Sequence, residues 1–136
     1  MLPKAHIFFG AIFSIILHLF GLTTFQCTII FLSSFLIDFD HYAWFVMKKK
    51  NLSLKKAFYY LKTMDKKKPM LMFFHTIEFL FLILILSFFF DIFKFVFIGM
   101  MFHSVLDIIE LKHTNELHLR EFLFSRYLFL DKSKYG

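Results

Sequence analysis

The chain has 136 residues, of which 59% are hydrophobic and 24 are phenylalanine, and its mean hydropathy is +0.67. Soluble domains average roughly 45–50% apolar residues, so the composition excludes an ordinary globular protein and predicts an integral membrane protein. One cysteine, Cys27, excludes an internal disulfide framework and a cysteine-cluster metal site. The net charge of +6 is unevenly spread, so we interpret it as membrane orientation rather than nucleic-acid binding.

Long apolar runs predict four transmembrane helices, at about residues 5–20, 23–46, 70–90 and 92–111. Each run has close to the ~20 residues that a helix needs to cross ~30 Å of hydrocarbon. The runs lack the alternation of strands, and a helix satisfies its own backbone groups in lipid. We therefore expect an all-α fold, a four-transmembrane-helix bundle, with residues 1–136 as a single integral membrane domain.

The basic residues predict how this bundle is oriented. One lysine precedes the first run, nine lie at residues 48–68 and five Lys or Arg follow residue 111, which leaves only Lys94 for the opposite side. Cytoplasmic loops carry an excess of Lys and Arg. We expect a multi-pass protein of the cell (inner) membrane, with both termini and the lysine loop in the cytoplasm.

Two further segments are predicted to lie on the membrane surface. Residues 53–63 place apolar side chains on one helical face among lysines, and Ser53 is suited to cap the helix. Such a helix would contact anionic headgroups. Residues 116–130 interleave apolar and charged side chains in the same way. Membrane lipids are therefore the expected partners, and the oligomeric state is open.

Histidines and carboxylates interrupt the apolar runs near one end of the expected bundle. At ~1.5 Å per residue, His6, Asp40, His75 and Asp107 each lie ~24 Å from the outer turn of their own helix. Ionisable groups at membrane depth are costly and usually mark function. The candidate metal ligands are His6, Asp38, Asp40, His41, His75, His103 and Asp107.

The spacing of these residues supports a shared centre. His103 and Asp107 are four residues apart, and His75 and Glu78 three, so each pair shares a helix face. Asp38 and Asp40 are ~200° apart on a helix and reach one centre only if the helix ends or unwinds there. Nitrogen and oxygen ligands suit zinc, which we expect first, or manganese, iron or magnesium. More than four candidates allow one or two ions.

Other polar residues are assigned differently. Glu78 is expected to be a further ligand or the catalytic general base. His18 lies near the outer end of the first helix, ~18 Å from His6, and is left out. Three residues on the cytoplasmic side are also left out: Glu110, His113 and His118. A reading without metal remains open, in which the Asp pair caps a helix and the His–carboxylate pairs hold helices together.

Four motifs together resemble the YdjM-like family of LexA-regulated, inner-membrane metal-dependent hydrolases, over about residues 1–112. They are His6, Asp38-x-Asp40-His41, His75 and Gly99-x-x-x-His103-x-x-x-Asp107. The resemblance implies a helical membrane fold and distant kinship with zinc-dependent phospholipase C and the S1/P1 nucleases, whose metals are held by His and Asp on helices. At the third site the family commonly has His-Arg-x-x-x-His-Ser, whereas this chain has His75-Thr-Ile-Glu78.

These observations predict a phospholipase-like, metal-dependent hydrolase that cleaves a phosphoester or related bond of a lipid or lipid-linked substrate at the cytoplasmic interface. The depth of the site suggests the lipid, because headgroup esters lie at that level. The alternative is a non-enzymatic membrane protein that binds a metal or proton for transport or sensing. A pathway needs polar residues on both sides, and the outer half offers little besides His18, Thr23, Thr24 and Gln26.

Overall fold

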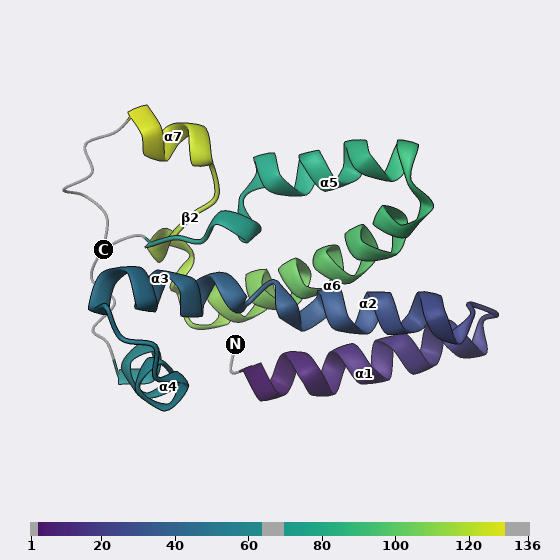
Figure 1. Ribbon diagram of the computed structural model, residues 1–136, viewed down its shortest axis with the longest axis horizontal. Helices are drawn as coiled ribbons and strands as arrows, with labels where there is room; N and C mark the ends of the chain where they lie inside the picture. Colours follow the sequence, from purple (N-terminus) through teal and green to yellow (C-terminus); the bar gives the residue numbers. More distant parts are fainter. Residues whose placement is uncertain (1–2, 64–69, 130–136) are drawn as a thin grey trace.

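The computed structural model describes residues 3–63 and 70–129, and these are mostly helical (Figure 1). The α-helices are α1 (Pro3–Leu19), α2 (Thr24–Leu36), α3 (Phe39–Lys49), α4 (Leu54–Thr63), α5 (Ile77–Phe89), α6 (Asp91–His113) and α7 (Phe124–Phe129). Two 3-10 turns are η1 (Phe73–His75) and η2 (Leu117–Leu119). The strands β1 (Met70–Leu71) and β2 (Arg120–Glu121) form a small parallel pair that the all-α expectation did not include.

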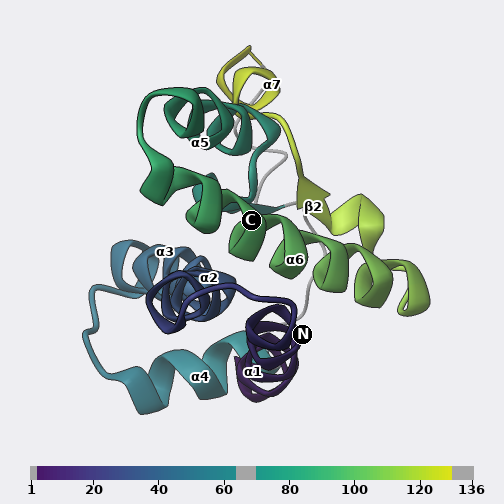
Figure 2. The same cartoon turned by 90° about the vertical axis from the view of Figure 1, so that its right-hand side faces the viewer.

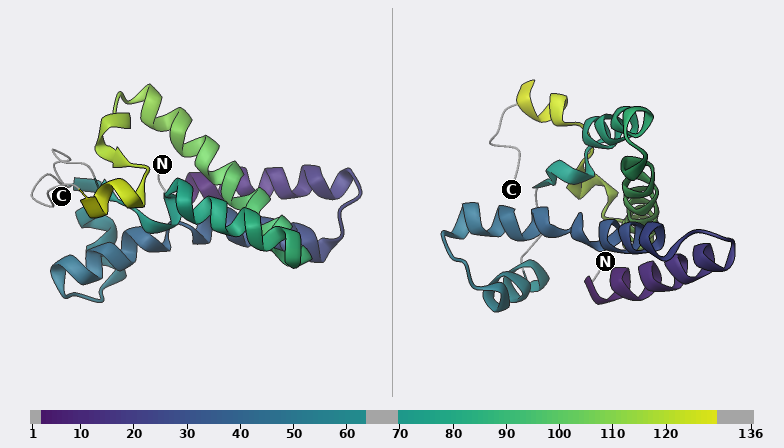
Figure 3. Two further views of the ribbon diagram at one scale, coloured as in Figure 1. Left: turned by 90° about the horizontal axis from the view of Figure 1, so that it is seen from above. Right: turned by 45° about the vertical axis from the view of Figure 1, so that its right-hand side comes forward.

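Helix α2 packs between α1 and α6, and α5 packs on α6 (Figures 1 and 3). Glycines lie at both contacts of α2. A Cβ on Gly10 would meet the Ser34 side chain, and a Cβ on Gly99 would meet Ser33 and the carbonyl of Ile30. Small residues of this kind let helix backbones approach closely. The close approach also brings together the neighbouring turns of α1 and α6, which carry His6 and His103.

The expectation of four membrane-spanning helices is wrong in number. Within residues 3–63 and 70–129, two stretches are long and apolar enough to cross a membrane, Thr24–Lys49 and Asp91–His113, whereas Lys4–Leu19 and Ile77–Phe89 are shorter. At ~1.5 Å per residue, α5 is only ~20 Å long. The run at residues 70–90 falls short as a helix because its first residues form β1 and η1.

The first of these stretches is interrupted between α2 and α3. The amide of Asp38 donates to the carbonyl of Phe35 at 3.2 Å, and that of His41 to Asp38 at 3.1 Å. These bonds span three residues instead of the four of an α-helix, so the turn is locally tightened. The interruption that the Asp38/Asp40 spacing required is therefore present.

The predicted surface segments take different forms. Ser53 accepts a hydrogen bond from the amide of Lys56 at 3.4 Å and so begins α4, as expected, and this helix lies beside α3 (Figure 2). The predicted segment at 116–130 contains η2, β2 and α7 within its described part, and it returns to the start of α5. There the amide of Ile77 donates to the carbonyl of Phe122 at 2.9 Å.

Large apolar side chains remain exposed on the helices. Leu19 and Phe20 at the end of α1, and Phe88 and Phe89 at the end of α5, are each more than 70% exposed. Exposed apolar surface of this extent marks contact with a membrane or another protein. The buried polar residues are concentrated elsewhere, where α1, α6 and the α2–α3 junction meet.

Candidate metal centre

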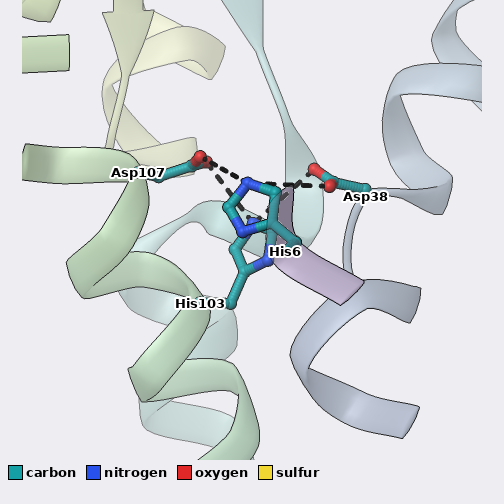
Figure 4. A group of neighbouring side chains, drawn as sticks. All are labelled: His6, Asp38, His103 and Asp107. Carbon is teal, nitrogen blue, oxygen red and sulfur yellow. Dashed lines mark ion pairs between the residues drawn. The ribbon is translucent and has the colours of Figure 1, made fainter. Parts of the chain in front are cut away.

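Four side chains from three parts of the chain converge at one point (Figure 4). His6 comes from α1, Asp38 from the α2–α3 junction, and His103 and Asp107 from successive turns of α6. One nitrogen or oxygen atom of each lies within 4.8 Å of the corresponding atom of every other. His6, His103 and Asp107 are at most 2% exposed. Burial of this many ionisable groups without a compensating charge would be costly.

The separations between these atoms are suited to a shared cation. Nε2 of His6 lies 3.1 Å from Oδ1 of Asp107, and Nε2 of His103 lies 3.4 Å from Oδ2 of Asp107. Asp38 is 3.6 Å from Nε2 of His103 and 4.0 Å from Nε2 of His6. Ligands at ~2.0–2.2 Å from a tetrahedral zinc ion are about 3.3–3.6 Å apart. The four side chains therefore fit a zinc-sized ion after small adjustments.

The hydrogen bonds of the buried histidines fix which ring nitrogens can bind such an ion. Nδ1 of His103 lies 2.7 Å from the carbonyl oxygen of Ser34. A carbonyl only accepts, so Nδ1 carries the proton and Nε2 of a neutral His103 holds a lone pair. Nδ1 of His75 likewise lies 3.0 Å from Oδ2 of Asp40 and donates to that carboxylate.

The consequence is an unfavourable contact between two nitrogens. Nε2 of His75 lies 3.0 Å from Nε2 of His103, and both atoms carry lone pairs when the rings are neutral. Burial, the largest influence, lowers the pKa of His75 below its ordinary 6.5 and so disfavours the proton that would relieve the contact. A metal ion beside both nitrogens would relieve it.

A second group of possible ligands adjoins the first. Asp38, His41 and His75 also place ligand atoms within 4.8 Å of one another. Oδ1 of Asp38 is 3.4 Å from Nδ1 of His41 and 3.8 Å from Nε2 of His75. Because Asp38 belongs to both groups, it would be a shared ligand residue if each group held an ion. Two-metal sites hold their ions ~3.5–4 Å apart.

Several buried polar atoms here have no hydrogen-bond partner within the described parts of the chain. They are Nδ1 of His6 and Oδ2 of Asp38, while Nε2 of His6, Oδ1 of Asp40 and Nδ1 of His41 lie close to an oppositely charged group without forming an aligned hydrogen bond. Each buried polar atom without a partner costs about 1–3 kcal/mol. Their concentration at one place indicates that the residues are arranged for a ligand, and nitrogen and carboxylate oxygen together are the donors that a divalent metal ion takes.

Asp40 lies behind the histidines. Its Oδ2 accepts from Nδ1 of His75 and, at 3.1 Å, from the amide of Phe74, and its Oδ1 is 2.9 Å from Nδ1 of His41. A carboxylate that receives the second ring nitrogen of a metal-binding histidine orients that ring. The geometry therefore gives Asp40 an orienting position relative to His75, although the sequence pattern predicts a ligand.

Glu78 faces the C-terminal segment. Its carboxylate accepts from the amides of Phe124 and Ser125, at 3.0 and 2.9 Å, and from the Ser125 hydroxyl at 2.8 Å. The Ser125 and Phe124 amides lower the pKa of Glu78 to about 2. The shared face predicted for His75 and Glu78 does not form, because Thr76 caps α5 and leaves His75 in η1. A ligand or base role for Glu78 remains a prediction.

Arg120 is a residue that the sequence analysis missed. Its Nη1 lies 2.6 Å from Oδ2 of Asp107, and its side chain is 12% exposed. Charge balance is the signal in the sequence that points to such a residue. The predicted ligands include three aspartates and no Lys or Arg, so a nearby basic side chain is expected to offset their negative charge. His18, which was left out, lies elsewhere and contacts the carbonyl of Leu22 at 2.8 Å.

Comparisons with known proteins name no family for this chain. No family model matches it, and neither does any curated protein or solved structure. The resemblance to YdjM-like hydrolases therefore stays a prediction from motifs. What the geometry shows directly is a set of buried histidines and aspartates compatible with a metal site.

Proposed function

We propose that the chain is a membrane-embedded, metal-dependent hydrolase that cleaves a phosphoester or related bond of a lipid or lipid-linked substrate. The observation that carries the proposal is the contact between Nε2 of His75 and Nε2 of His103, within reach of Asp38 and Asp107. Two lone pairs and two carboxylates directed at one another are stabilised by a shared positive charge, which a divalent ion would supply to all four groups at once. Zinc is the expected ion, with manganese, iron or magnesium as alternatives.

The chemistry of the ligands supports hydrolysis. A divalent ion held by these residues would polarise a phosphoryl oxygen and make water a better nucleophile at neutral pH. The histidines would bind through the nitrogens identified above, while Ser34 and Asp40 keep the rings of His103 and His75 in place. The motif resemblance to YdjM-like hydrolases favours the same class of reaction.

A membrane location is part of the proposal. It is supported by the length and apolar character of Thr24–Lys49 and Asp91–His113 and by the exposed phenylalanines. With α1 and α5 entering the membrane as the shorter arms of hairpins with α2 and α6, the lysine loop and both termini share one side, and the lysine distribution favours the cytoplasm for that side. Nζ of Lys48 lies 4.6 Å from the centre of the Trp44 ring. Nζ of Lys49 lies at the same distance from the ring of Tyr60, which belongs to α4. A basic and aromatic surface of this kind suits anionic headgroups.

The alternative is a protein that binds a metal or proton for transport or sensing. Chains of ionisable residues along a bundle would favour that function. The ion-pair contacts of the buried histidines instead gather around Asp107 of α6 and Asp38 of the adjacent α2–α3 junction. Among the described residues away from it, the buried polar side chains include Ser14 and Ser87, which carry no charge. This one-sided arrangement favours a reaction site over a conduit.

Turnover of a phospholipid panel by detergent-purified protein tests the proposal. We expect release of a headgroup or phosphate that requires added divalent metal and is lost in Asp38→Asn. Asp91→Asn is the matched control, because Asp91 is 86% exposed and pairs only with the neighbouring Lys94 among its described contacts. Full turnover in Asp38→Asn would contradict the proposal, and metal binding without turnover of any phosphoester would favour the alternative.

A further inference from the structure

Arg120 reaches the metal centre from a part of the chain that supplies none of its ligands. It lies in β2, which pairs in parallel with β1 so that Arg120 is the partner of Met70. β1 leads directly into η1, which carries His75. The bond between Ile77 and Phe122 continues this association. The guanidinium is therefore held by the same local structure that positions a histidine of the centre.

The guanidinium of Arg120 contacts the cluster, and the Arg120 side chain is partly exposed. Nη1 contacts Oδ2 of Asp107, and that same oxygen is 3.4 Å from Nε2 of His103 and 3.6 Å from Nε2 of His75. The side chains of His6, His103 and Asp107 are at most 2% exposed, whereas those of Arg120, Asp38 and His41 are 12%, 18% and 25% exposed and leave the centre accessible on their side. A planar guanidinium has five N–H donors, so the contact with Asp107 leaves donors for a second group.

The charges of the centre favour an anionic occupant. Three carboxylates, Asp38, Asp40 and Asp107, and one guanidinium give a formal charge of −2 with neutral histidines. One divalent ion would neutralise this charge, and two would change it to +2. A neutral ester has no charge in its ground state, so its binding would gain less from a guanidinium next to such ions than that of a phosphate group. A phosphate group is charged, and its oxygens match the fork of an arginine.

We propose that Arg120 binds a non-bridging oxygen of the phosphate group of the substrate, so that the centre acts on phosphate esters and not on neutral esters. This inference rests on the proposed metal-dependent function. Arg120 then has two contacts, one with Asp107 and one with the phosphate. The phosphate can belong to a lipid headgroup or to a water-soluble phosphomonoester, and the chemistry of recognition is the same for both.

Binding of inorganic phosphate to the zinc-loaded protein in detergent, measured by calorimetry beside zinc content, tests the proposal. We expect Arg120→Met to weaken phosphate binding about 10- to 100-fold, the loss typical of a hydrogen bond to a charged group, with zinc content unchanged. Arg120→Lys keeps the charge but not the fork, so we expect an intermediate loss. Arg126→Met is the matched control, because Arg126 is 64% exposed and 3.9 Å from Glu121.

Phosphate affinity in Arg120→Met equal to that of the wild type would overturn the proposal. So would loss of zinc together with phosphate in both Arg120 variants, since Arg120 would then only position Asp107. Wild-type protein that takes up none of zinc, manganese, iron and magnesium would instead refute the proposed function. Glycerol phosphate and phosphatidic acid in mixed micelles then compete with phosphate. Displacement by either compound supports the proposal: displacement by the lipid alone indicates a headgroup, displacement by glycerol phosphate alone indicates a water-soluble ester, and displacement by both indicates that the centre accepts either, whereas displacement by neither contradicts the proposal.

Discussion

Nδ1 of His75 lies 3.0 Å from Oδ2 of Asp40, 35 residues away along the chain. The same oxygen accepts the amide of Phe74, so Asp40 holds both the ring of His75 and the backbone that carries it. Because the ring donates through Nδ1, its Nε2 is directed at His103 with a lone pair. Asp40 thereby determines how His75 presents itself to a metal ion.

Asp40→Asn is expected to weaken metal binding without abolishing it. The amide keeps the size of the carboxylate but removes its charge, and it can offer only one oxygen to His75, Phe74 and His41. Loss of an orienting carboxylate typically lowers metal affinity about 10- to 100-fold. Zinc affinity measured by competition with a chelating dye checks this expectation. Asp91→Asn should bind zinc as the wild type does.

The size of the effect separates two roles for Asp40. A decrease within the expected range supports an orienting carboxylate. Complete loss of zinc would make Asp40 a direct ligand, as the sequence pattern alone predicts, and an unchanged affinity would show that the contact with His75 is unimportant for binding.

Gly99→Ala is expected to destabilise the fold and the centre together. The added Cβ would collide with the Ile30 carbonyl as well as with Ser33, and a backbone atom cannot move aside without separating α2 from α6. Overpacking of this kind costs about 1–3 kcal/mol in the free energy of unfolding. Denaturant unfolding followed by circular dichroism measures the loss, and zinc affinity should fall because His103 lies one turn further along α6.

Gly10→Ala provides the comparison. Its nearest obstacle is the hydroxyl of Ser34, a side-chain atom, so Ser34→Ala should recover part of the stability lost in Gly10→Ala. Ser33→Ala should recover less in Gly99→Ala, because the Ile30 carbonyl remains. Equal recovery in both pairs would show that backbone contact does not limit the approach of α2 and α6.

Docking of the C-terminal segment is expected to weaken in acid. The pKa of Glu78 is about 2 in the folded protein against an ordinary 4.5, because the Ser125 and Phe124 amides donate to its charged form. A lowered pKa means that the docked state is fully favoured above pH 4.5 and loses this contribution as the pH falls from 4.5 toward 2. Hydrogen exchange at the Ser125 amide, corrected for intrinsic rates, should report decreasing protection over that interval.

Amides within α6 serve as the internal reference for this experiment, since their protection should change less than that of Ser125. Glu78→Gln removes the titrating group and should give weak protection at every pH. Protection of Ser125 that stays constant in the wild type from about pH 5 to pH 2 would contradict the assigned contact.

Part of the site follows from local spacing. His103 and Asp107 lie on successive turns of α6, and this relation needs only a regular helix. The Asp38/Asp40 spacing required an interruption, which the structure has between Leu36 and Phe39. Depth along apolar runs likewise places His6 near these residues, because α1, α2 and α6 are regular over the length concerned.

The remainder depends on contacts between distant segments. Residues 70–76 are apolar enough to continue a helix, but β1 pairs with β2 and Thr76 caps α5, so His75 and Glu78 point to different partners. Arg120 reaches Asp107 through that same pairing of β1 with β2. No helical spacing in the sequence relates Arg120 to the other residues of the site. The same pairing shortens the third run to Ile77–Phe89, whereas the first run is short as a helix in its own right, at Lys4–Leu19.

Metal content is the measurement that tests the metal centre most directly. Elemental analysis of detergent-purified wild-type protein is compared with a His103→Ala/Asp107→Ala variant of verified helical content. We predict about one or two zinc, manganese or iron ions per wild-type chain and none in the variant. Absence of metal from both proteins, even after reconstitution with several divalent ions, would contradict a metal centre and leave the buried histidines and aspartates as contacts that hold the helices together.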